Sequence, residues 1–82
     1  MSKFAAAVRS LADLIPGQRA RVAAVSGPAA SRNRLLEMGL TRGTVIELIR
    51  VAPLGDPIEL ELRGYRLSVR RAEAANVSIE SA

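Results

Sequence analysis

The sequence contains no cysteine and no histidine. Without cysteine, the chain can form neither a disulfide nor a thiolate metal site. Without histidine, it lacks the commonest transition-metal ligand and the commonest general base. No Ser–Lys or paired-carboxylate arrangement suited to catalysis stands out either. We therefore expect a binding protein rather than an enzyme, with no catalytic residue, cofactor or metal site of its own.

Aromatic residues and long apolar runs are also scarce. The chain has one Phe, one Tyr and no Trp, so it lacks the aromatic platforms on which single-stranded bases stack. No stretch approaches the ~20 apolar residues of a membrane span, and the N-terminal apolar run is shorter than the ~7–15 residues of a secretory signal. We expect a cytoplasmic protein that neither binds nucleic acid nor inserts into a membrane.

Positive charge is the main feature of the composition. The formal net charge is +4, and every basic residue except Lys3 is arginine. Such a surface favours an acidic partner, although ordinary solvated arginine accounts for the charge as well. The 82 residues suffice for one domain. We expect a flexible extension over residues 1–9 and one domain over residues 10–82.

Glycine and proline divide this domain into short elements. Ser10 and Asp13 fit a capping box at the start of one helical turn, and Pro16-Gly17 fits a type II turn. A strand should follow over residues 19–25. One face of this strand is predicted to carry Ala20, Val22 and Ala24.

The segment Ala29–Met38 should form a short helix. Two starts are compatible with the sequence, one at Ala29 and one with Ser31 as the N-cap. Gly39 supplies a left-handed end, and a Schellman motif there would bring Leu40 against Leu35.

Residues 44–52 should form the second strand. Their apolar positions change parity, which predicts a bulge near Leu48, and bulges of this kind help small barrels to close. A helical turn over residues 71–75 and a last strand over residues 77–79 are expected near the C-terminus, the last strand pairing near the first. The sequence therefore predicts an all-β fold, a small barrel of about five strands with one short α-helix between strands 1 and 2.

The remaining two strands predict a specific hairpin. Residues 58–63 alternate apolar and charged side chains, as a half-buried strand does. Gly64-Tyr65 fits a two-residue type II′ connection with glycine first. That connection would place Glu59 opposite Arg70, joining opposite charges across the hairpin.

An ordered set of motifs resembles the ferrous iron transport protein A (FeoA) family. The motifs lie between about residues 10 and 80, and their order is more specific than any one of them. They are Leu11-x-x-Leu14-x-Pro16-Gly17, Arg34-Leu35-Leu36-x-Met38-Gly39-Leu40-x-x-Gly43, Ala52-Pro53-Leu54-Gly55-Asp56-Pro57-Ile58, and Arg63-Gly64-Tyr65-x-Leu67-x-x-Arg70-x-x-Glu73-Ala74.

The resemblance implies an SH3-like barrel with a role in bacterial iron homeostasis. It implies a cytosolic accessory protein for ferrous iron uptake, which interacts with the GTP-binding domain of the membrane ferrous iron permease, ferrous iron transport protein B. The protein would then be cytoplasmic, or peripheral at the inner membrane through the permease. A similar SH3-like domain ends iron- and manganese-dependent repressors, so the alternative is a stand-alone regulatory module that binds such repressors or other proteins. Self-association into a homo-oligomer is a further option.

The loop between residues 52 and 58 is the first candidate for partner contact. It comprises Pro53, Leu54, Gly55, Asp56 and Pro57. Its two prolines reduce the entropy lost on docking, and an apolar residue at its tip is either folded back or offered to a partner. The simpler account is that the loop only closes a hairpin, with glycine at positive φ and the aspartate bonding its own backbone.

The helix surface is the second candidate. Leu36 lies about 100° around the helix from Leu35 and should be half exposed, whereas Leu35 and Met38 should face the barrel. Arg32 and Arg34 should project outward, either toward acidic groups of a partner or simply into solvent.

Carboxylates are the only conventional metal ligands in the chain. Glu59 and Glu61 share one face of a strand, and Asp56 is close in sequence. Hard oxygen ligands of this kind hold a divalent ion at best weakly. Weak binding of a transition metal ion is therefore kept only as an alternative.

Overall fold

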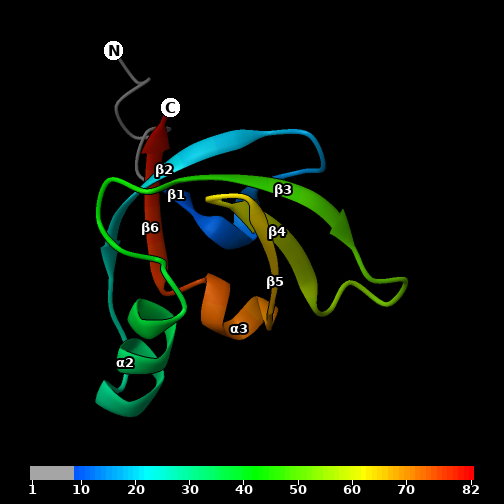
Figure 1. Cartoon of the computed structure of the whole chain (residues 1–82). Coiled ribbons are helices and arrows are strands. Elements are labelled where there is room, and N and C mark those ends of the chain that lie inside the picture. The colour runs from blue at the N-terminus through cyan, green and yellow to red at the C-terminus, as the bar shows by residue number, and fades with distance from the viewer. Residues whose placement is uncertain (1–8) are drawn as a thin grey trace.

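The computed structural model describes residues 9–82 (Figure 1). In chain order, the elements are β1 (Arg9–Ser10), the short 3₁₀-helix η1 (Leu11–Asp13), β2 (Arg19–Val25), α2 (Ala29–Glu37), β3 (Val45–Val51), β4 (Ile58–Leu62), β5 (Tyr65–Val69), α3 (Arg71–Ala74) and β6 (Val77–Ser81). The six strands form one antiparallel sheet in the order β1-β6-β2-β3-β4-β5.

The expected all-β fold is confirmed, and so is the helix between the first two long strands, β2 and β3. The last strand pairs with β2, as predicted. The two-residue strand β1 adds one strand to the five expected, because Arg9 pairs with Ile79 of β6. The predicted flexible extension otherwise covers residues 1–8, which lie outside the described residues.

The core lies inside the curved sheet and is closed by η1, α2 and α3 (Figure 1). Strand β4 shows most clearly how the sequence builds the core. Its apolar residues are buried and its glutamates are only partly buried, as period-two alternation requires. The buried apolar residues are Leu11, Leu14, Ala20, Val22, Leu35, Leu40, Ile46, Leu48, Ile58, Leu60, Leu62, Val69, Ala74, Val77 and Ile79.

The N-terminal turn follows the predicted capping box. The Ser10 side chain accepts a hydrogen bond from the Ala12 amide at 3.2 Å, and Asp13 Oδ2 accepts one from the Ser10 amide at 3.1 Å. The Pro16-Gly17 turn also forms as predicted, with Gly17 at φ +93°.

The two long strands each contain a bulge, one predicted and one not. Strand β3 shifts register between Leu48 and Arg50, which confirms the predicted bulge and lets Val51 pack on the core. Strand β2 shifts register between Val22 and Ala24. Because the extra residue reverses the alternation, Ala24 is exposed whereas Ala20 and Val22 are buried, and the predicted common face of the three residues is wrong at Ala24.

Helix α2 begins at Ala29, with Pro28 as an N-cap that makes no side-chain bond. The alternative start with Ser31 as N-cap is therefore wrong. The C-terminal end is the predicted Schellman motif. The Leu40 amide donates to the Leu35 carbonyl at 3.1 Å and the Gly39 amide to the Leu36 carbonyl at 3.0 Å.

The β4–β5 hairpin differs from the prediction by two residues of register. Its loop is Arg63-Gly64, with φ of +50° and +84°, so the turn is type I′ rather than type II′. Glu59 therefore lies opposite Ser68 instead of Arg70. A shift of two residues keeps every side chain on its predicted face. It also lets the Tyr65 hydroxyl donate to the Met38 carbonyl at 2.5 Å, which joins β5 to the end of α2.

Candidate partner-binding surface

The loop between β3 and β4 presents an exposed leucine. The Gly55 amide bonds the Ala52 carbonyl at 2.7 Å, and the Ala52 amide bonds the Pro57 carbonyl at 3.0 Å, so the loop is a compact turn on a paired base. Leu54, at its tip, is 96% exposed. The leucine at this apolar tip is therefore exposed rather than folded back onto the domain.

A partly buried network of hydrogen bonds fixes the base of this loop. The guanidinium of Arg71, at the start of α3, donates to the Gly55 carbonyl and to the Ala12 carbonyl, both at 2.9 Å. Asp56 Oδ1 accepts a hydrogen bond from the Arg71 backbone amide at 2.9 Å. The loop, α3 and η1 are therefore held together. The expected bond between Asp56 and its own backbone is replaced by this cap on α3, where the helix dipole favours a carboxylate.

Helix α2 offers a weaker surface than the sequence suggested. Leu36 is 37% exposed, as expected, and Leu35 is fully buried. Arg34 forms an ion pair with Glu73 of α3 and approaches the Met38 sulfur at 3.9 Å. Its charge is thus compensated within the domain. Arg32 is exposed, and none of the hydrogen bonds or ion pairs found within residues 9–82 involves its side chain.

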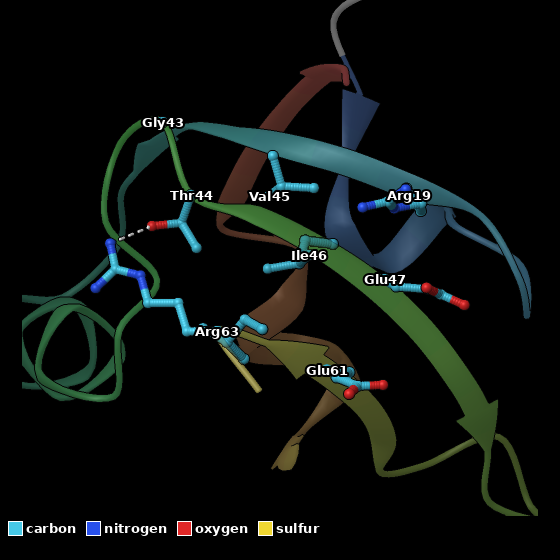
Figure 2. Close-up of a pocket in the computed structure, with 9 residues that line it drawn as sticks. Arg19, Gly43, Thr44, Val45, Ile46, Glu47, Glu61 and Arg63 are labelled. Carbon is cyan, nitrogen blue, oxygen red and sulfur yellow. Dashed lines mark hydrogen bonds between the residues drawn. The ribbon is translucent and has the colours of Figure 1, made fainter. Parts of the chain in front are cut away.

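A shallow hollow of about 540 Å³ lies over the outer face of β2, β3 and β4 (Figure 2). At one end, Arg63 Nη2 donates to Thr44 Oγ1 at 3.1 Å, which ties the β4–β5 turn to the loop before β3. At the other end, Arg19, Glu47 and Glu61 lie side by side across neighbouring strands. The hollow is polar and open, so it suits a charged surface better than an enclosed small molecule.

The carboxylates named as conceivable metal ligands do not come together. Asp56 caps α3, and Glu59 forms an ion pair with Arg50 at 3.5 Å. Glu61 faces Glu47 instead. In the part of the chain that the structure describes, no three Asp, Glu, His or Cys residues are grouped to hold a metal ion.

Sequence reasoning missed two residues that organise this surface. At Arg71 the sequence predicts only a helical turn. Its hydrogen bond to the Ala12 carbonyl could not be predicted, because Ala12 is 59 positions away and no local pattern marks such a contact. Tyr65 is predicted in the hairpin turn, whereas its hydroxyl reaches α2 from β5. The type I′ turn that places Tyr65 in β5 requires a positive φ at Arg63, and the sequence gives no sign that this arginine adopts it.

No helix within residues 9–82 combines the length and the apolar character needed to cross a membrane.

Comparison with known proteins identifies the family. A model of the FeoA domain matches residues 9–81. An Fe(2+) transport protein A/Fe(2+) transporter FeoB fusion protein of Porphyromonas gingivalis is 37% identical over 70 residues, which cover 85% of this chain and 8% of that relative. The chain thus spans less than a tenth of the length of this curated relative.

Solved structures agree with the family match. The FeoA protein of Chlorobium tepidum shares 42% identity and superposes with a TM-score of 0.82, over 88% of this chain and 69% of that one. The zinc complex of Stenotrophomonas maltophilia FeoA, described as a prokaryotic SH3 domain protein, shares 25% identity with a TM-score of 0.76, over 87% of this chain and 88% of that one. The chain therefore belongs to the FeoA domain family, which is involved in ferrous iron transport, and has an SH3-like fold.

Proposed function

We propose that this chain is an accessory protein for ferrous iron uptake that docks its Leu54 loop onto the cytosolic GTP-binding domain of a ferrous iron permease, ferrous iron transport protein B. The observation that carries the proposal is a leucine 96% exposed at the tip of a loop whose base is fixed. The Porphyromonas gingivalis relative is a fusion of Fe(2+) transport protein A with the Fe(2+) transporter FeoB, which supports the choice of partner. The contribution of this chain is binding, and the chemistry belongs to the partner.

The fixed base of the loop supports the proposal on energetic grounds. Burying one leucine side chain contributes about 1.5–3 kcal/mol, whichever surface covers it. A mobile loop loses part of that gain to ordering on association. Here the hydrogen bonds that Arg71 makes to Gly55 and Asp56 hold the loop before the partner arrives. Most of the burial energy is therefore available for affinity.

Binding of the purified GTP-binding domain, measured by calorimetry, tests the proposal. Leu54→Asp should weaken binding by about tenfold to a hundredfold, because it places a charge where a leucine would be buried. Ile15→Asp is the matched control. Ile15 is 61% exposed on a different turn, so its replacement should leave the affinity unchanged.

Two outcomes separate the parts of the proposal. If the wild-type chain does not bind the GTP-binding domain, the choice of partner is wrong. If the wild type binds and folded Leu54→Asp binds equally well, the partner stands but the loop is not its contact. Loss of affinity in both aspartate variants would point to a general effect of charge.

A further inference from the structure

Strand β5 (Tyr65–Val69) is the outermost strand at one end of the sheet order. It pairs with β4 on one side, and within residues 9–82 no strand pairs with its other side. Figure 1 shows it beside β4, running down toward α3. Such an edge can add a further strand through main-chain hydrogen bonds.

The hairpin register fixes which backbone groups this edge offers. A two-residue loop makes Leu62 and Tyr65 a hydrogen-bonded pair, and antiparallel geometry then alternates bonded and non-bonded pairs along the hairpin. The N–H and C=O groups of Arg66 and Ser68 therefore point away from β4. Both residues are exposed. They supply alternating donors and acceptors for an incoming strand.

The side chains along this edge include two arginines that form no ion pair with any described residue, and Glu61 of β4 lies opposite the first of them, Arg66, in the register. Arg66 and Ser68 lie on the solvent face of β5, and Arg70 follows directly after it. The ion pairs within residues 9–82 use Arg34 and Arg50, so neither Arg66 nor Arg70 has a carboxylate within ion-pair distance. Ser68 lines two hollows, of about 410 and 280 Å³, the first shared with Arg66 and the second with Arg70.

The opposite face of the same edge is apolar. Tyr65 is 44% exposed, and Leu67 is partly buried against the core. A strand added here would therefore meet arginine on one face and apolar side chains on the other.

We propose that β5 receives an extended segment of a partner protein that alternates acidic and apolar residues and pairs with the free edge at Arg66 and Ser68. A second copy of this chain is a poor occupant. In a pairing of two β5 edges, the other copy would present Arg66 and Arg70 and no carboxylate, so it would not complement the charge of this edge. This surface excludes Leu54 and does not rest on the permease proposal.

The probe is an acetylated, amidated peptide of alternating Glu and Val, and the control peptide has the same composition in two blocks. We expect saturable binding of the alternating peptide at low salt, measured by fluorescence anisotropy. In the complex, the Arg66 and Ser68 amides should exchange with solvent about tenfold more slowly, as newly bonded amides do.

Ser68→Pro should weaken peptide binding by about tenfold or more, because proline removes the outward N–H without breaking a bond to β4. Ser68→Ala keeps that N–H and should bind as the wild type does. Arg66→Glu should weaken binding comparably, whereas Arg42→Glu, at an exposed arginine in the loop before β3, should not. Leu54→Asp should bind the peptide normally, which separates this edge from the permease contact.

Several results would overturn the proposal. They are the absence of saturable binding up to about 1 mM peptide, equal binding of the blocked peptide, and unchanged affinity in both Ser68→Pro and Arg66→Glu. Sedimentation showing a wild-type dimer that protects the Arg66 and Ser68 amides would overturn it too, because a second copy would then be the occupant.

Discussion

Replacing Gly39 with alanine should destabilise the protein for two separable reasons. Gly39 has φ +106°, where an L-residue costs about 1–2 kcal/mol. A Cβ at this position would also lie well inside van der Waals distance of the Tyr65 hydroxyl and 3.2 Å from Leu62 Cδ1. The hydroxyl must then move off the Met38 carbonyl, which loses a hydrogen bond of about 0.5–1.5 kcal/mol.

The total cost of Gly39→Ala is therefore about 1.5–3.5 kcal/mol. A domain of this size has on the order of 5 kcal/mol of stability, so roughly half would be lost. Equilibrium urea unfolding measures the change directly. With a slope of about 1 kcal/mol per molar urea, the midpoint should fall by about 1.5–3.5 M.

A matched glycine and a double mutant separate the two causes. Gly43 has φ +90°, and a Cβ added there would meet nothing within 4 Å, so Gly43→Ala should show the backbone cost alone. Tyr65→Phe removes the hydroxyl and should cost about 1 kcal/mol. In the double mutant, Gly39→Ala with Tyr65→Phe, the new methyl meets no hydroxyl, so the combined loss should fall short of the sum by about 1 kcal/mol. Additivity to within about 0.5 kcal/mol would refute the contact between this glycine and tyrosine.

Two further substitutions test the loop and the core. Asp56→Ala should lower the free energy of unfolding in urea by about 0.5–2 kcal/mol, because it removes the cap on α3. The same substitution should weaken binding of the permease domain, because it releases the Leu54 loop. Unchanged amide exchange across residues 52–57 would contradict this release. Leu60 is fully buried in β4, so Leu60→Ala should lower the free energy of unfolding by about 3–5 kcal/mol. Circular dichroism at about 37 °C should then detect little folded protein. A fully folded variant would contradict the central role of β4 in the core.

Local rules succeeded where a residue acts on near neighbours. The capping box of Ser10 and Asp13 and the Schellman end at Gly39 depend on contacts within one or two turns, and both formed as predicted. The bulge in β3 was visible because large apolar residues changed parity. The bulge in β2 was not, because Ala23 and Ala24 look alike on either face of a strand.

The candidate site was only partly predictable for a related reason. The exposed tip at Leu54 could be anticipated from its proline-flanked loop. Its rigidity could not, since it depends on Arg71, which meets Gly55 and Ala12 only in the folded chain. The pairing of Arg34 with Glu73 is equally non-local, and it removes one of the charges expected to face a partner.

The pairing of β1 with β6 has a consequence for any protein in which this domain is one part. It places both ends of the described chain on neighbouring strands, and Figure 1 shows the β3–β4 loop on the far side of the molecule from the C-terminal end. A tether joined to either end would leave the domain on the same side and would not cover Leu54. Tethering then raises the local concentration of the loop near a fused partner without obstructing it, and a modest contact is enough for high occupancy.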